Sequence, residues 1–179
     1  MPRRVLILFA HPAFHRSRAN RALIDAVRGL EDVTFHDLYE AYPDLMVDVP
    51  REQGLLEAHD AVVMQHPFYW YSAPALVKEW LDLVLTHKWA YGEGGTALAG
   101  KTWLSAITSG GSEESYGPRG GNRFSVEEFL RPFEATAQLC GMHWRKPFVL
   151  HASHLVSQSE LVDAALKYRA EILALQRDA

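Results

Sequence analysis

The chain has 179 residues, of which 48% are hydrophobic and 22% charged, so we expect one domain over residues 1–179 with a buried core. Eighteen Lys and Arg residues against 22 Asp and Glu residues give a formal net charge of -4 without a long basic run, which excludes nucleic acid as an expected partner. The single cysteine cannot form an internal disulfide, and the apolar stretch 5–10 is too short for a signal peptide core or a membrane span. The expected location is the cytoplasm.

Five β-favouring apolar segments alternate with segments of helical periodicity along the chain. The predicted strands are, in order, residues 5–10, 33–38, 60–66, 101–111 and 146–152. The predicted helices begin at Ser17, Pro50, Pro74, Ser125 and Ser157, and the fourth is expected to reach Cys140. Serine caps, prolines in first turns and Ser-x-x-Glu capping boxes support these starts. The alternation predicts an α/β fold with a parallel sheet and helices on both faces.

The residues after strands one, three and four are the candidates for a binding site, because open parallel sheets bind ligands beyond the carboxyl ends of their strands. After the first strand, Ser17 and Asn20 open a helix whose N-terminal N–H groups attract an anion, and Arg16 or Arg18 is suited to neutralise a phosphate. The alternative is that Ser17 only caps the helix and both arginines are solvated. Neither a P-loop nor a G-x-G-x-x-G fingerprint occurs, so the usual nucleotide-binding motifs do not explain this segment.

Four consecutive aromatic residues, Phe68, Tyr69, Trp70 and Tyr71, follow the third strand. One core cannot bury all four, because consecutive side chains point in different directions. A planar ligand is a fitting partner for the rings that the core leaves out. The alternative is that two rings face the core and two cover a loop.

A glycine pair, Gly110 and Gly111, follows the fourth strand and lets backbone N–H groups approach a ligand closely. The hydroxyl groups of Thr108, Ser109 and Tyr116 lie beside it in the sequence. The alternative is an ordinary glycine-rich turn. Taken together, an anion site, aromatic rings and backbone donors at three strand ends match the needs of a flavin mononucleotide.

Several segments resemble the flavodoxin-like NAD(P)H:quinone oxidoreductases, and the resemblance covers nearly the whole chain. They are "AHP" after the first strand, "S-x-A-N" at the first helix, "QHPFYWYSAPALVKEWLD" and "TSGG". "HDLYEAYPDLMVDVPREQ", "GGTALAGK" and "LRPFEATAQLCGMHW" resemble one branch, the ancillary proteins of glutathione-regulated potassium-efflux systems. The resemblance implies a flavodoxin-like, doubly wound sheet of five parallel strands in the order 2-1-3-4-5.

The resemblance also implies FMN as the cofactor, with FAD as an option, and NADH or NADPH as the co-substrate. The positions that match the family's flavin contacts are His11, Ser17, Arg18, Ala19, Asn20, Phe68, Tyr69, Trp70, Tyr71, Thr108, Ser109, Gly110, Gly111 and Tyr116. Gly110, Gly111 and Tyr116 are the expected catalytic residues, because their donors would stabilise negative charge on the reduced ring. Larger relatives carry a histidine six residues after this tyrosine, where this chain has Asn122.

The implied activity is a two-electron, ping-pong transfer of hydride from NAD(P)H through FMN to a quinone. The family suggests a homodimer in which the segment "HKWAYG" reaches the partner's active site, so Trp89 and Tyr91 are candidate substrate contacts, with loop packing as the alternative. Trp80, Leu81 and Leu85 extend the expected dimer face. A different function stays open: a flavin- or nucleotide-binding regulatory subunit of a potassium-efflux antiporter, held peripherally at the inner face of the cell membrane.

A metal hydrolase is disfavoured, because no carboxylate is spaced as a ligand partner for His11 and His15. We expect no metal site. His66 is interpreted as a strand-end residue satisfied by backbone groups, and Cys140 as a buried, unreactive thiol.

Overall fold

A parallel β-sheet forms the centre of the computed structural model, which describes residues 2–177. The strands are β1 (Val5–Phe9), β2 (Val33–Asp37), β3 (Ala61–Pro67), β4 (Thr102–Thr108), β5 (His143–Trp144) and β6 (Phe148–Leu150). They pair in the order β2-β1-β3-β4-β5, β6 also pairs with β4, and every pair is parallel. The predicted flavodoxin-like strand order is confirmed.

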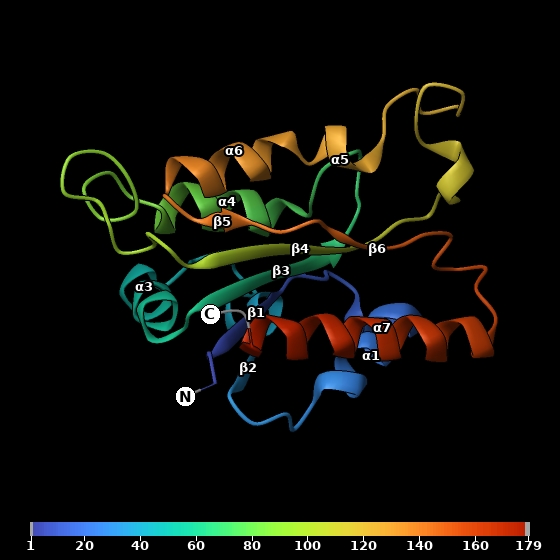
Figure 1. Ribbon diagram of the computed structural model, residues 1–179, viewed down its shortest axis with the longest axis horizontal. Coiled ribbons are helices and arrows are strands. Elements are labelled where there is room, and N and C mark those ends of the chain that lie inside the picture. The colour runs from blue at the N-terminus through green and yellow to red at the C-terminus, as the bar shows by residue number, and fades with distance from the viewer. Residues whose placement is uncertain (1, 178–179) are drawn as a thin grey trace.

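Helices cover both faces of the sheet, as predicted (Figure 1). One face carries α1 (Arg18–Val27) and α7 (Gln158–Arg177), and the other carries α3 (Val49–Ala58), α4 (Ala75–Val84), α5 (Val126–Phe129) and α6 (Arg131–Leu139). A short helix, α2 (Leu38–Ala41), follows β2, and the single 3-10 turns η1 (Phe14–Arg16) and η2 (Glu113–Ser115) follow β1 and β4.

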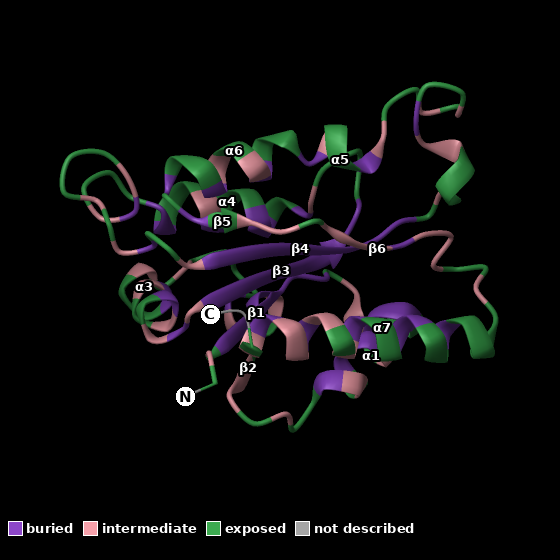
Figure 2. Ribbon diagram, viewed as in Figure 1, coloured by how far each residue is buried: buried purple, intermediate pink, exposed green. Residues whose placement is uncertain are grey.

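The three central strands β1, β3 and β4 are buried along their whole length (Figure 2). Successive side chains alternate between the two faces, so Leu6 and Leu8 pack under α3 to α6, while Val5, Ile7 and Phe9 pack against α1 and α7. Continuous apolar runs are therefore required in these strands, and this pattern is what made them predictable.

The fifth strand is not the single segment that the sequence predicted. Trp144 pairs with Trp103 and Phe148 pairs with Ala106, so three residues of this edge stand opposite two residues of β4. The extra residue forms a bulge within residues 145–147, which ends at Pro147, a residue with no N–H group to donate to a ladder. The edge strand is split into β5 and β6 for this reason.

The helix expected from Ser125 to Cys140 is also divided. Its capping box is present, with Ser125 N donating to Glu128 Oε2 at 2.7 Å and Glu128 N donating to Ser125 Oγ at 3.2 Å. The helix breaks at Leu130, where α5 ends and α6 begins, because Pro132 has no N–H for a continuous helix. The prediction of one unbroken helix was wrong.

A buried carboxylate joins the elements on one face of the sheet. Glu52 of α3 is fully buried and accepts hydrogen bonds from His36 Nε2 (2.7 Å), Tyr42 Oη (2.5 Å) and Trp80 Nε1 (2.8 Å). Burial raises the pKa of Glu52, but the hydrogen bonds from His36, Tyr42 and Trp80 outweigh burial and hold the pKa below its ordinary value. Trp80 thus belongs to the core and is not part of a dimer face as the sequence suggested, and Leu85 is also buried.

Candidate functional site

A cavity of about 480 Å³ opens beyond the carboxyl ends of the parallel strands. These strand ends lie on the right in Figure 1. The cavity is lined by residues from the loops after β1, β3 and β6 and from the start of α1: His11, Ala13, Arg16, Ser17, Arg18, Ala19, Tyr69, Ser153 and His154. None of the described residues in this lining is acidic, whereas two are arginines and two are histidines. The cavity is suited to an anion.

The first turn of α1 provides the anion-attracting end of this cavity. Ser17 is the N-cap, and its Oγ accepts hydrogen bonds from Asn20 N (3.2 Å) and Asn20 Nδ2 (3.1 Å). Arg18 and Ala19, the next residues of this turn, line the cavity, and the positive end of the helix dipole favours an anion there. The guanidinium of Arg18 donates to the Val156 carbonyl, which ties α1 to the loop after β6.

Asn20 does not line the cavity, although it belongs to the predicted binding residues. Its amide donates to Thr108 Oγ1 (3.0 Å) and its Oδ1 accepts from Gln65 Nε2 (3.1 Å). Gln65 in turn accepts from Tyr168 Oη at 2.8 Å. Both amide hydrogens and the amide oxygen of Asn20 are therefore engaged inside the protein, and this side chain supports the site from beneath.

His11 follows β1 and is buried at the wall of the cavity. Its Nδ1 accepts a hydrogen bond from Ala13 N at 3.0 Å. Burial, and to a smaller degree the charge of His15, lower the pKa of His11 below its ordinary value. His11 is therefore neutral at pH 7 with its hydrogen on Nε2, which leaves one N–H donor for a ligand.

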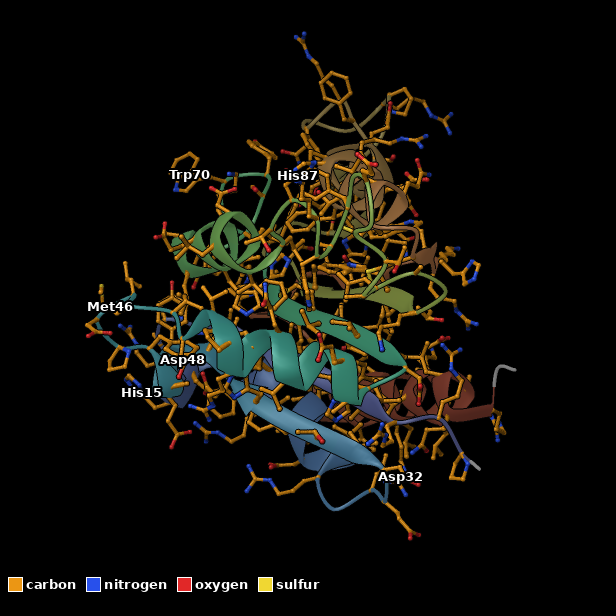
Figure 3. The ribbon with its side chains drawn as sticks, turned by 90° about the vertical axis from the view of Figure 1, so that its left-hand side faces the viewer. His15, Asp32, Met46, Asp48, Trp70 and His87 are labelled. Atoms are coloured by element: carbon orange, nitrogen blue, oxygen red, sulfur yellow. The ribbon has the colours of Figure 1, made fainter. Side chains whose placement is uncertain are left out.

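The four aromatic residues after β3 separate into different environments. Phe68 packs in the core, Tyr69 lines the cavity, and Tyr71 stacks on Phe129 with ring centroids 4.8 Å apart. The Trp70 side chain is 92% exposed and stands out from the ribbon in Figure 3. The prediction that one core cannot bury all four rings is confirmed.

Trp70 and Tyr71 also adopt an unusual backbone conformation. Their φ angles are 49° and 61°, in the left-handed region that side chains rarely occupy, and Ser72 N donates to the Tyr69 carbonyl at 3.0 Å to close the turn. A left-handed residue other than glycine costs about 1–2 kcal/mol. Such a cost at a strand end next to a cavity is typical of a functional segment.

The loop after β4 lies next to the cavity, because a Cβ atom on Gly110 would lie 3.8 Å from Cε1 of His154. Thr108 and Ser109 are buried, while Gly110 is exposed, and among the described residues nothing accepts a hydrogen bond from the N–H groups of Gly110 and Gly111. A Cβ atom on Gly111 would lie 3.1 Å from Cε2 of Tyr116 and 3.2 Å from its hydroxyl. The absence of a side chain at Gly111 thus lets Tyr116 lie directly over the loop.

Three residues of the site were missed by sequence reasoning. His151, Ser153 and His154 follow β6 and contribute to the cavity or to the contacts of Tyr116 and Ser109. The rule that ligands bind beyond the carboxyl ends of parallel strands applies to the fifth strand as much as to the others. Applied there, it would have pointed to these residues.

Trp89 and Tyr91 lie far from the cavity of their own chain. They belong to the loop after α4, at the left of Figure 1 and opposite the strand ends. Trp89 Nε1 donates to Glu57 Oε1 of α3 at 2.9 Å, and Tyr91 packs against His87 at a ring distance of 5.6 Å. Within one chain, these two residues pack a loop.

His66 and Cys140 are buried in the core. His66 Nδ1 bonds the Pro67 carbonyl at 2.9 Å, but Nε2 has no partner among the described residues, so the expected backbone bond satisfies only one ring nitrogen. Burial lowers the pKa of His66 to about 4 and raises the pKa of the Cys140 thiol. Residues 2–177 contain no cluster of three metal-ligating side chains, and none of their helices is long and apolar enough to cross a bilayer.

The sheet order defines an α/β protein of the flavodoxin type. In proteins of this type, ligands bind at the switch point of the winding, and the cavity lies at the same end of the sheet. Residues 3–173 match the model of a protein family whose description is "flavodoxin-like fold". The chain belongs to this family.

Three relatives match most of this chain over most of their own length. The glutathione-regulated potassium-efflux system ancillary protein KefG of Pectobacterium carotovorum is 48% identical over 167 residues, which cover 93% of this chain and 91% of KefG. General stress protein 14 of Treponema denticola, solved in complex with FMN, has a TM-score of 0.92 at 42% identity and covers 97% of this chain and 99% of its own. An NADPH-quinone reductase from P. pentosaceus has a TM-score of 0.87 at 30% identity, covering 94% and 96%.

Proposed function

We propose that the chain is an FMN-dependent NAD(P)H:quinone oxidoreductase. The observation that carries the proposal is the cavity at the strand ends, which joins the positive start of α1 to Tyr69 and to His154, the neighbour of Gly110. Its volume of about 480 Å³ lies within the range of small-ligand sites. The similarity to an FMN complex and to an NADPH-quinone reductase supports the assignment.

The donor set fits FMN from end to end. Arg16, Ser17 and the N–H of Ala19 are suited to hold the phosphate, since a helix start and a guanidinium both favour an anion. Tyr69, which lines the cavity, and its exposed neighbour Trp70 are suited to lie beside the flat ring. The N–H groups of Gly110 and Gly111, in the adjacent loop, are suited to donate to the edge of the ring. We favour FMN over FAD because one helix start and one cluster of cations suit a single phosphate group.

Bound FMN would supply hydride chemistry between NAD(P)H and a quinone, each using the same open face in turn. The protein's own groups have three tasks in this scheme. Gly110 and Gly111 stabilise negative charge through backbone N–H groups, Tyr116 adds a hydroxyl donor, and Trp70 offers an exposed ring against which a nicotinamide or quinone stacks.

We further propose a homodimer in which Trp89 and Tyr91 contact the substrate in the partner's site. Their distance from the cavity of their own chain allows this role only across an interface. A groove of about 450 Å³ between α4 and α6, lined in part by Leu81, Leu139 and Tyr91, offers apolar surface for a second chain.

A regulatory role is the second candidate function, and the 48% identity to KefG favours it. In that case the protein docks on a membrane potassium-efflux protein and responds to bound flavin or nucleotide without needing turnover. The two roles are compatible in one chain, because the strand-end cavity and the outer helix faces are separate surfaces.

One experiment separates these functions. The purified protein is loaded with FMN, and NADPH oxidation is followed at 340 nm with and without a soluble benzoquinone. The oxidoreductase proposal predicts quinone-dependent turnover with saturation in both substrates. Tight FMN binding without turnover would leave only the regulatory function, and a protein that takes up no flavin would contradict the enzyme.

A further inference from the structure

A buried chain of hydrogen bonds runs from Tyr168 of α7 to the start of α1 at the cavity. Tyr168 Oη lies 2.8 Å from Gln65 Oε1 on β3, and Gln65 Nε2 lies 3.1 Å from Asn20 Oδ1. Asn20 Nδ2 then lies 3.1 Å from Ser17 Oγ and 3.0 Å from Thr108 Oγ1. Tyr168, Gln65 and Asn20 are at most 1% exposed, so solvent does not compete for these bonds.

The Tyr168 hydroxyl sets the direction of this chain. A side-chain amide fits such a chain either way round, with its oxygen or its nitrogen toward the tyrosine. Among residues 2–177, the hydroxyl of Tyr168 has Gln65 as its sole hydrogen-bonding partner, and burial raises the pKa of Tyr168, so the hydroxyl keeps its hydrogen. If Gln65 Nε2 faced Tyr168, that hydrogen would stay without an acceptor in the core, which is costly. Gln65 Oε1 must therefore face Tyr168.

The direction set at Tyr168 passes on to Asn20. Gln65 Nε2 can only donate, so Asn20 turns its Oδ1 toward it. Both hydrogens of Asn20 Nδ2 then go to the hydroxyl oxygens of Ser17 and Thr108. In the opposite direction, the hydroxyl hydrogens of Ser17 and Thr108 would instead go to Asn20 Oδ1.

Ser17 Oγ consequently has no lone pair left for a ligand. It accepts from Asn20 N at 3.2 Å and from Asn20 Nδ2, and a hydroxyl oxygen has two lone pairs. Ser17 lines the cavity, so its one hydrogen is available to donate there. His11 also lines the cavity and, with Nδ1 accepting from Ala13 N, likewise offers only its Nε2–H group.

We propose that Tyr168 and Gln65 are positioning residues that fix the Ser17 hydroxyl as a donor toward the cavity. A fully ionised phosphate monoester is favoured by such a site, because its terminal oxygens only accept hydrogen bonds, whereas an alcohol has a hydrogen of its own to place. The choice of FMN as this ligand rests on the proposed oxidoreductase function. The direction of the hydrogen-bond chain belongs to the protein alone.

Neutron diffraction from crystals of the cofactor-free, full-length chain in deuterated solvent tests the direction. The deuterium on Tyr168 Oη is expected to point to Gln65 Oε1, and the deuterium on Ser17 Oγ to point into the cavity. A Ser17 deuterium that points to the Asn20 side chain would overturn the inference. This test requires no flavin.

The affinities for FMN and riboflavin test the consequence for ligand binding, because riboflavin has a hydroxyl group in place of the phosphate. Tyr168→Phe frees the Gln65 amide to take either direction, so only part of the molecules present the Ser17 donor. FMN binding should weaken about threefold, while riboflavin binding should stay unchanged. Tyr42→Phe is the matched control: it also removes a buried tyrosine hydroxyl, the one bonded to Glu52, and should bind both flavins like the wild type.

A double-mutant cycle separates positioning from general support of the fold. In a Ser17→Ala background, Tyr168→Phe should no longer change FMN affinity, because the hydroxyl that it orients is gone. Equal weakening in both backgrounds, or for both flavins, would show that Tyr168 only supports the packing of α7 and would overturn the inference. A wild-type protein that binds no flavin would refute the oxidoreductase function, and the neutron result would still decide the direction of the chain.

Discussion

Trp70 and Tyr71 show at the scale of single residues how the aromatic run after β3 is used. The turn holds both in the left-handed region, directs Tyr71 onto Phe129 and leaves the Trp70 ring in solvent. Glycine or asparagine would fit this backbone at lower cost. Under the proposed function, the exposed Trp70 ring is a stacking surface for a ligand, and this use would offset the backbone strain.

Arg16 is expected to contribute charge at the phosphate end of the cavity. Arg16→Gln should weaken FMN binding about tenfold, because a charge-assisted contact is lost. Raising the salt concentration should weaken binding to the wild type more than to the variant, since the lost interaction is screened. Equilibrium fluorescence titration measures both effects. Arg28→Gln at the far end of α1 is the matched control and should bind FMN like the wild type.

Gly111 is expected to tolerate no side chain without moving Tyr116. A Cβ atom there would lie 2.6 Å from Ser115 Oγ and 3.1 Å from the Tyr116 ring, so Gly111→Ala should displace both at a cost of about 1 kcal/mol. Quinone turnover should fall more than thermal stability does. Gly54→Ala in α3 is the control, because a Cβ atom there meets nothing within 4 Å. Equal turnover in the two variants would show that the position of Tyr116 is unimportant.

At the scale of elements, strands that are buried on both faces were predictable and the edge of the sheet was not. Residues 5–10 and 61–64 are continuous apolar runs, since both of their faces meet helices. The bulge within residues 145–147 depends on pairing with β4, which no local pattern reports. The break before Pro132 did have a local signal, because a proline interrupts a helix. The capping box at Ser125 nevertheless favoured the prediction of one unbroken helix.

The candidate site followed from the sequence in three of its four loops. The loops after β1, β3 and β4 carry distinctive residues, whereas the loop after β6 carries only His151, Ser153 and His154 among ordinary neighbours. The inward orientation of the Asn20 side chain could not be predicted from the neighbouring sequence either. Its side chain is fixed by Gln65 and Thr108, which are more than 40 residues away in the chain.

Glu52 of α3 forms hydrogen bonds to β2, to the end of α2 and to α4. Glu52→Gln should therefore lower the free energy of unfolding by about 3 kcal/mol at pH 7. Because its pKa is lower in the folded than in the unfolded protein, the stabilisation is complete above the unfolded value of about 4.3 and is lost as pH falls through the folded pKa. Urea unfolding at several pH values should show the difference from wild type shrinking in acid. Glu79→Gln, exposed on α4, should change stability by less than about 0.5 kcal/mol.

At the scale of the whole molecule, α4 connects the two ends of the sheet. The loop before α4 carries Tyr69 at the strand ends, and the loop after it carries Trp89 and Tyr91 at the opposite end of the sheet. In the proposed homodimer, a two-fold axis places the loop of one chain at the cavity of the other. This geometry requires an oligomer if Trp89 and Tyr91 are to contact substrate.

Sedimentation should therefore give twice the mass of one chain. Trp89→Ala should leave FMN binding unchanged and lower kcat/KM for the quinone about tenfold, since a stacking wall is lost from the partner's site. Leu155→Ala, a change at an exposed apolar residue, is the control. A fully active monomer would contradict the shared site.

The titration of cofactor-free protein with FMN tests the central claim most directly. We predict saturation at one FMN per chain, with the binding curve shifted about tenfold in Arg16→Gln and unchanged in Arg28→Gln. Such a result would locate the cofactor in the cavity at the start of α1. Absence of saturable binding, or equal affinity in all three proteins, would contradict the assignment.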